Sequence, residues 1–327
     1  MFPRLRENVW HINPERETAL LITSQTSYEV PVMPALQFLK MRSYCTGHHS
    51  VDDIASRSGL SVDDVNALLG SLRPAGVVYF SSDTQDTIPH PVVRDTLVRA
   101  CRIWASELRI SYIGNEFSAG DLPKSVLIGW LLEMYHYIRD FPSAIQHAAD
   151  RADGRLEEVL TRYAAEERGH EGFVLDTLVR LGLSRAEVTT SIPLLSTRLI
   201  GFLMRELFEL APCSALMVAA VIEAQEFDGD RIDDFKRSLH EHYAIDPQAF
   251  DPYFKHQQID VGLGHAELLG SHLDLVDIDD RRTLDQVVNK IHDLKHAFDL
   301  QGIEIKTYFT ALTGKYFPRQ PVNFESI

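Results

Sequence analysis

The chain is organised around the stretch Arg155–Gly182, which reads RLEEVLTRYAAEERGHEGFVLDTLVRLG. Its apolar side chains recur at the three- and four-residue spacing of one helix face, so we expect a helix over Arg155–Leu181 that stops at Gly182. These apolar side chains are Leu156, Val159, Leu160, Tyr163, Phe173, Val174, Leu178 and Leu181. Glu167 and His170 are three residues apart, and on a helix such side chains are neighbours. A carboxylate and an imidazole placed in this way can bind one metal ion.

The composition is typical of a globular protein. The chain has 327 residues, enough for two domains, and a formal net charge of −15. This charge argues against a nucleic acid or an anionic membrane as the main partner. No apolar run reaches the roughly 18 residues of a membrane-spanning helix, and MFPRLRENVW lacks the apolar core of a signal peptide, so we expect a cytoplasmic protein. Cys45, Cys101 and Cys213 show no paired spacing and are expected to be buried, reduced thiols.

Residues 1–88 are expected to form a small α+β domain. The β-prone runs are Val9–His11, Ala19–Ile22 and Tyr28–Val32. Two helical patterns follow, which begin at Ser50 and Ser61, and each serine precedes an acidic first turn. Val77–Phe80 then resembles a closing strand, before the polar linker Ser81–Pro91. The order helix, turn, helix and strand is winged-helix-like, but its few basic residues favour a peptide-binding or structural role over DNA binding.

Residues 89–327 are expected to form a helical bundle, because long helical patterns follow one another with short connections. The expected helices are Thr96–Leu108, Ser125–Asp140, Ala144–Asp153, Arg155–Leu181, Pro193–Glu209, Ser214–Phe227, Asp230–His242, Pro252–Leu273 and Asp285–Thr313. Phe141 and Pro142 are expected to interrupt the helical structure between Ser125–Asp140 and Ala144–Asp153.

Two apolar helices each carry an acid that is a candidate metal ligand. Glu133 lies in the middle of an apolar helix, where an unpaired carboxylate costs several kcal/mol, so it should face either a cation or solvent. His136 is a ligand, a neighbour of a ligand or a core histidine. Glu223 directly follows a buried apolar run, and Glu226 is the alternative on nearly the same face.

A further helix offers two histidines and an aspartate. His256 and Asp260 are one turn apart and share a face. His265 comes five residues after Asp260, which on an ideal helix would place it about 140° away. Two glycines between them would permit a π-bulge or local unwinding that returns His265 to the same site. Otherwise His265 lies outside the site, and Glu267 is the alternative ligand.

Carboxylates and imidazoles on four helices favour iron or manganese over structural zinc. Several carboxylates able to bridge favour two metal ions, and such a pair with open positions is suited to the activation of O2.

The spacing of these residues resembles that of the haem-oxygenase-like di-metal oxidases, a family of seven-helix bundles that bind no haem. The resemblance covers about residues 95–315. The positions that match the family's ligands are Glu133, Glu167, His170, Glu223, His256 and Asp260. The last histidine of the pattern departs from the family, since Leu263 stands at its position and His265 comes two residues later.

The resemblance implies two Fe(II) ions, with O2 as co-substrate. It implies oxidation or oxygenation of a small amino-acid- or fatty-acid-derived molecule, often in natural-product biosynthesis. Tyr135, Tyr137 and His136 would then line or gate the substrate pocket. The first domain resembles the PqqD-like winged helix, which docks peptides in its family, so presentation of the substrate by a peptide stays open, as does a homodimer.

Three alternatives remain open from the sequence. A thiaminase-like hydrolase with the same bundle would need a nucleophilic cysteine in its pocket, and Cys213 is the candidate. A cofactor-free oxidase related to the pyrroloquinoline quinone synthases would not need carboxylates on four helices. A non-catalytic peptide-binding module would use the first domain alone.

Overall fold

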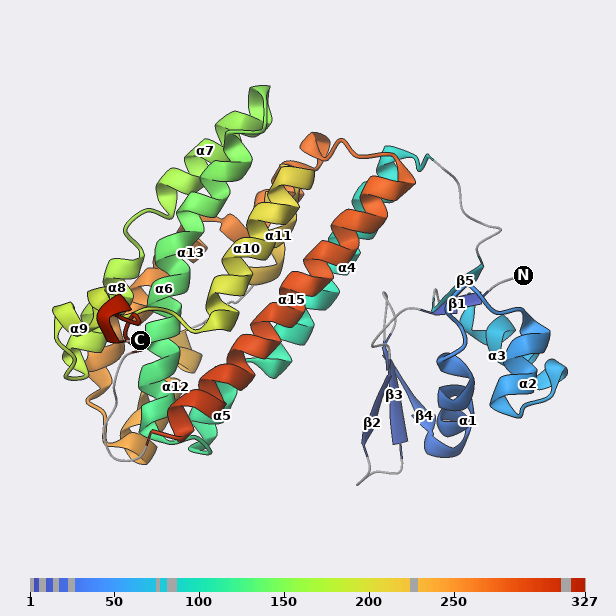
Figure 1. The fold of residues 1–327 in the computed structure, drawn as a ribbon, viewed down its shortest axis with the longest axis horizontal. Helices are drawn as coiled ribbons and strands as arrows, with labels where there is room; N and C mark the ends of the chain where they lie inside the picture. The colour runs from blue at the N-terminus through green and yellow to red at the C-terminus, as the bar shows by residue number, and fades with distance from the viewer. Residues whose placement is uncertain are drawn as a thin grey trace. The chain divides into compact units, whose positions relative to one another are not determined.

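The computed structural model of the chain describes residues 3–5, 10–13, 18–22, 27–74, 77–80, 87–223, 229–312 and 319–326. The chain divides into two compact units, Met1–Ile88 and Pro89–Ile327 (Figure 1). Each unit buries a hydrophobic core of its own. No helix in the described part of the chain is both long and apolar enough to cross a membrane.

The first unit combines two small antiparallel sheets with helices. The strands are β1 (Pro3–Leu5), β2 (Trp10–Asn13), β3 (Thr18–Ile22), β4 (Ser27–Pro31) and β5 (Val78–Phe80). One sheet has the order β2-β3-β4, and β1 pairs with β5 in the other. The helices are α1 (Val32–Arg42), α2 (Val51–Ser58) and α3 (Val62–Leu72). The sequence did not predict α1, because its residues continue directly from the β-prone run that forms β4.

Helices α2 and α3 begin directly after Ser50 and Ser61, the capping residues expected from the sequence. Ser50 Oγ accepts a hydrogen bond from the backbone N–H of Asp53 at 3.2 Å, and Ser61 Oγ accepts one from Asp64 at 3.1 Å. Each serine thereby satisfies one of the free N–H groups at the start of its helix. The winged-helix comparison for this unit stays a prediction.

The second unit is a helical bundle, which confirms the mainly α fold. Its longer helices are α4 (His90–Ser111), α6 (Lys124–Ala149), α7 (Gly154–Glu166), α8 (Glu171–Arg180), α10 (Leu195–Leu210), α11 (Ser214–Ile222), α12 (Gly229–Tyr243), α13 (Asp251–Leu263) and α15 (Arg281–Thr310). Its shorter elements are α5 (Gly114–Ala119), α9 (Arg185–Thr190), η2 (Pro247–Phe250), η3 (His265–Glu267), α14 (Leu268–Ser271), η4 (Leu273–Leu275) and η5 (Phe324–Ser326).

Helix α6 is the centre of this bundle. It packs against α7, α8, α10 and α15, while α10 also packs on α15 and α11 packs on α4 (Figure 1). Most of the α6 side chains between Val126 and Ile138 are buried, which is the pattern of a helix covered on every side.

The predicted break at Phe141 and Pro142 is wrong, because α6 continues through both residues. A proline inside a helix removes one hydrogen bond and costs roughly 3 kcal/mol. Here Phe141, Pro142 and the following Ala144 and Ile145 are all buried, and their packing offsets that cost.

Two other predicted helices are each divided in the structure. The helix expected over Arg155–Leu181 is α7 followed by α8, with a turn between them in which Gly169 has φ 92°. The helix expected over Pro252–Leu273 ends at Gly264, which has φ 72°. Glycine adopts such positive φ angles without the steric cost that other residues meet. Both interruptions fall beside candidate ligands.

A glycine on α6 sets how closely α15 approaches. A Cβ atom at Gly129 would lie 2.2 Å from the ring of Phe309 on α15. We expect Gly129→Ala to lower the free energy of unfolding by about 1–2 kcal/mol, because overpacking costs about 1–3 kcal/mol and the better helix propensity of alanine returns less than about 1.

The matched control is Gly302→Ala on α15, where an added Cβ meets no atom within 4 Å. This substitution should leave the full-length chain as stable as before or up to about 1 kcal/mol more stable in urea unfolding. Equal effects of the two substitutions would show that close packing at Gly129 does not constrain the bundle.

Candidate metal centre

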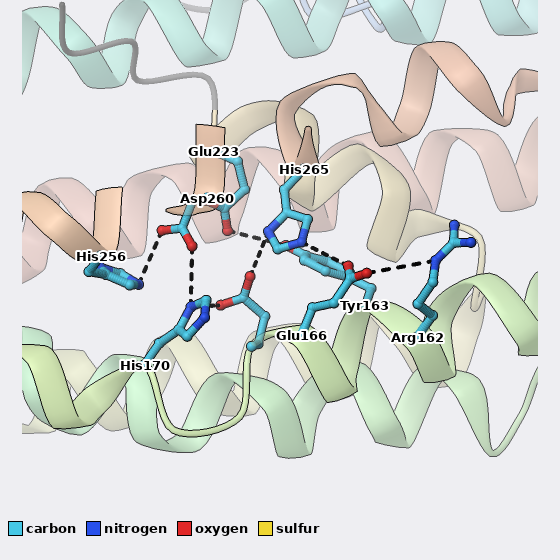
Figure 2. Close-up of polar contacts among 9 residues, drawn as sticks. Arg162, Tyr163, Glu166, His170, Glu223, His256, Asp260 and His265 are labelled. Atoms are coloured by element: carbon cyan, nitrogen blue, oxygen red, sulfur yellow. Dashed lines mark hydrogen bonds and ion pairs between the residues drawn. The ribbon is translucent and has the colours of Figure 1, made fainter. Parts of the chain in front are cut away.

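Acids and histidines from four helices meet at one place in the second unit (Figure 2). We call these residues the Glu-His cluster; they are Glu166, Glu167, His170, Glu223, His256, Asp260 and His265. Only His256 and Asp260 lie inside a regular α-helix away from its ends. The others lie at the end of α7, in the turn before α8, directly after α11 and in η3. The chain breaks described above therefore position most of the cluster.

One group of candidate ligands consists of Glu167, His170, His256 and Asp260, each with an atom within 4.8 Å of the others. His170 Nδ1 lies 3.2 Å from Asp260 Oδ1 and 3.4 Å from Glu167 Oε2. His256 Nε2 lies 3.1 Å from Asp260 Oδ2. Two imidazoles and two carboxylates at these separations can surround one cation.

A second group consists of Glu167, Glu223 and His265. His265 Nδ1 lies 2.7 Å from Glu167 Oε1. Glu167 thus belongs to both groups, with Oε1 facing the second group and Oε2 facing the first. A carboxylate in this position can bridge two cations.

Several buried atoms of the cluster lack hydrogen-bond partners among the described residues. These atoms are Glu167 Oε1, His170 Nδ1, both ring nitrogens of His256, Asp260 Oδ1 and His265 Nδ1. They lie close together without the alignment of hydrogen bonds. A buried polar atom left in this state costs about 1–3 kcal/mol, and more when it is charged. Two divalent cations would satisfy these atoms and would balance the four carboxylates of the cluster, so the donor set fits a pair of metal ions.

The two carboxyl groups of the second group have opposite pKa shifts. Burial raises the pKa of Glu167, but the imidazoles of His170 and His265 outweigh burial and lower it to about 2. Burial, together with the negative charges of Glu167 and Asp260, raises the pKa of Glu223 to about 8. Without a cation, the ionised form of Glu167 and the protonated form of Glu223 are therefore favoured.

A cavity of about 430 Å³ adjoins the cluster. Glu167, Glu223, His256 and Asp260 form part of its wall, so the accessible surface of the half-buried Glu223 faces this space. The aromatic residues of the wall are Tyr112, Trp130, Tyr137, Phe141, Tyr253 and Phe298. The cluster thus lies beside a space that can hold a small molecule.

The structure does not bring Glu133 to the cluster, contrary to the expectation from the sequence. Glu133 is 2% exposed, and its Oε2 accepts hydrogen bonds from the backbone N–H of Leu194 at 3.0 Å and from Thr197 Oγ1 at 2.5 Å. The cavity side of α6 carries Trp130, Met134, Tyr137, Ile138 and Phe141. Because successive residues turn by about 100°, Glu133 points away from the centre of that side and towards α10.

Tyr135 and His136 are also turned away from the cavity. His136 Nε2 lies 2.8 Å from Ser191 Oγ, and Tyr135 packs beneath the guanidinium of Arg139. Of the three neighbouring residues expected to line or gate the pocket, the structure places Tyr137 in its wall.

The alternatives left open by the sequence are resolved in part. His265 joins the cluster through unwinding at Gly264, whereas Glu267 is exposed. Glu223 joins the cluster, and Glu226 lies outside the described residues. Glu167, His170, His256 and Asp260 converge as expected, although the first two lie in a turn instead of on a helix.

The sequence did not indicate Glu166 as a member of the cluster, or Tyr163 as a residue that contacts it. Glu166 Oε2 lies 3.1 Å from His265 Nε2, and Tyr163 donates a hydrogen bond to Glu223 Oε1 at 3.2 Å. Tyr163 looked like an ordinary member of the apolar face of α7. The doublet Glu166-Glu167 was a usable signal, since two adjacent acids before a glycine turn can serve different partners.

Comparison with known proteins supports the fold. No family model and no curated protein matches the chain. A solved domain with a haem oxygenase-like fold from Shewanella denitrificans OS217 superposes with a TM-score of 0.54 at 20% identity, over 67% of this chain and 95% of that one. This likeness shows that the second unit has a haem oxygenase-like fold.

Two TenA homologues superpose with lower scores. The protein from P. horikoshii OT3 gives a TM-score of 0.48 at 14% identity, over 66% of this chain and 98% of its own. The protein from Pseudomonas syringae pv. tomato DC3000 gives 0.47 at 12% identity, over 68% and 99%.

The buried carboxyl of Glu133 should make stability depend on pH. Burial raises its pKa to about 7, against the hydrogen bonds from Thr197 and Leu194. The folded state therefore favours the protonated form of Glu133. The free energy of unfolding is highest below the unfolded pKa of about 4.5 and falls as the pH rises from there through about 7.

Glu133→Gln keeps an acceptor for both hydrogen bonds but cannot ionise. We expect it to remove the fall in stability with rising pH. Between about pH 5.5 and pH 8, the stability of the variant relative to the wild type should rise by about 2 kcal/mol. Urea unfolding of the metal-free chains measures this change. Parallel pH profiles for the two proteins would contradict a titrating Glu133.

Proposed function

We propose that this protein binds two Fe(II) ions in the Glu-His cluster and uses O2 to oxidise a small molecule held in the adjoining cavity. The observation that carries the proposal is the position of Glu167, whose two oxygens face two different groups of candidate ligands. When bound, two Fe(II) ions would supply the electrons that O2 needs to become an oxidant.

The residues of the cluster divide into three roles under this proposal. His170, His256 and Asp260 would hold one ion, while Glu223 and His265 would hold the other. Glu167 would bind both, and its low pKa keeps it ionised for this role. Carboxylate oxygens and imidazole nitrogens in these numbers suit iron better than a closed zinc site.

The cavity supports a small substrate that combines an apolar body with a polar group. Its volume is within the range of about 300–1,000 Å³ that is usual for ligand pockets. Its wall also carries an ion-pair group, in which Lys295 Nζ lies 2.9 Å from Asp299 Oδ2 and 3.4 Å from Glu107 Oε2. The amino-acid- or fatty-acid-derived molecules suggested by the family resemblance have this make-up.

The hydrolase alternative has less support. Burial raises the pKa of the Cys213 thiol to about 11, so the thiol is almost fully protonated at neutral pH and is a poor nucleophile. No cysteine is among the described residues of the cavity wall. Docking of a peptide by the first unit, and presentation of the substrate in that way, remains part of the proposal.

Anaerobic addition of Fe(II) to the full chain, followed by O2, tests the proposed function. We expect two iron ions for each chain, consumption of O2 and a transient visible absorption band. A chain that takes up no iron, or that holds iron without reacting with O2, would refute the proposal.

Single substitutions should separate the two ions. Glu167→Gln should weaken the binding of both ions, because the shared carboxylate is lost. Glu223→Gln should weaken the binding of one ion only, and His256→Ala the binding of the other only. Each loss of affinity should exceed the 10–100-fold that is usual when a residue behind a ligand is removed.

Iron stoichiometry at buffered free Fe(II) measures these effects, and circular dichroism checks that the helices persist. Glu158→Gln, an exposed acid on α7, is the matched control and should retain both ions. Retention of two ions by Glu167→Gln would exclude a shared carboxylate.

A further inference from the structure

His265 is held by carboxylates at both of its ring nitrogens (Figure 2). Nδ1 lies 2.7 Å from Glu167 Oε1, and Nε2 lies 3.1 Å from Glu166 Oε2. The ring is 1% exposed, and it meets the ring of Tyr163 edge to face at a centroid distance of 4.7 Å.

These contacts define the orientation of the imidazole. A rotation of the ring by 180° would replace both nitrogens with carbon atoms, so Glu166 would lose its hydrogen bond and a carbon atom would face Glu167 Oε1. Nδ1 must therefore be the nitrogen that faces Glu167 and Glu223, and Nε2 the one that faces away from the candidate ions.

The position of His265 in the chain explains why it needs an external partner. His256 and Asp260 are oriented by α13, but that helix ends at Gly264, and His265 begins the short turn η3. Because α13 ends before His265, the helix itself does not fix the direction of this side chain.

We propose that Glu166 is a positioning residue that prepares His265 for the second metal ion. Its carboxylate accepts a hydrogen bond from Nε2–H of His265, which fixes that tautomer and leaves the lone pair of Nδ1 for the ion. This inference rests on the proposed two-ion site and assigns a role to a residue outside both candidate ligand groups.

Two features suit Glu166 to this role. It is half-buried, and Arg162 Nε lies 3.9 Å from its Oε1, while its Oε2 is the oxygen that faces His265. A hydrogen bond from an imidazole N–H to a carboxylate makes the opposite nitrogen a stronger ligand. The imidazole ring also stands between Glu166 and Glu167, which keeps Glu166 from acting as a direct ligand in this arrangement.

Titration of the metal-free full chain with Co(II) tests the proposal without relying on activity. In Glu166→Ala we expect the first equivalent of Co(II) to bind as in the wild type and the second to bind about 10–100-fold more weakly. Glu166→Gln keeps an acceptor oxygen, so its affinity for the second equivalent should lie between that of the wild type and that of Glu166→Ala. Glu158→Ala, an exposed acid on the same helix, is the matched control and should bind both equivalents normally.

A double substitution separates positioning from a general effect on the fold. In a His265→Ala background, Glu166→Ala should not weaken the binding of the second ion any further, because Glu166 acts only through His265. The imidazole ¹⁵N spectrum of the Zn(II)-loaded wild type should place the proton of His265 on Nε2.

Three results would overturn the proposal: normal binding of both equivalents by Glu166→Ala, equal weakening of both equivalents, or a proton on Nδ1 of His265. A wild-type chain that takes up fewer than two ions would overturn the proposed function and this inference together. A wild-type chain with two ions and an unaffected Glu166→Ala variant would overturn this inference alone.

Discussion

The second unit must accommodate concentrated negative charge inside a helical bundle. Glu167 is 3% exposed, Glu166 and Glu223 lie near His265, and Asp260 lies between His170 and His256. The surrounding carboxylates raise the pKa values of His170 and His265, so these imidazoles offset part of the negative charge, but ionised groups removed from water are costly unless they are fully paired. Protonation relieves part of this repulsion, as the raised pKa of Glu223 indicates. Divalent cations would relieve it more completely and would leave every carboxylate free to act as a ligand.

Much of this arrangement could be predicted from the sequence, because apolar spacing shows which side of a helix is buried. The helical bundle and the serine-capped helices α2 and α3 follow from such local signals. The glycines between Asp260 and His265 indicated that unwinding was possible there, but the break at Gly169 was not predicted, because a glycine within a helical pattern adopts a positive φ only where distant contacts stabilise it. The continuous path of α6 through Pro142 has the same origin, since its neighbours in the bundle stabilise it.

Glu133 shows a different limit of the sequence. A carboxylate in an apolar helix must find a partner, but the pattern does not say whether that partner is a cation or a hydrogen-bond donor. Its donors here are Leu194 and Thr197, about sixty residues further along the chain and at the start of α10. The same uncertainty hid Glu166, whose partner His265 is separated from it by 99 positions.

The placement of the cluster at the ends of helices has a mechanical consequence. Helix ends are the parts of a bundle that separate most readily, since their last backbone groups lack partners within the helix. Ions that join the ends of α7, α8 and α11 to α13 would add a link between these helix ends, beyond the packing of α13 on α8 and of α11 on η3. Uptake of metal would then do more than equip the cavity for chemistry: it would reduce local opening of these helix ends, so proteases would cleave an unloaded chain more readily than a loaded one.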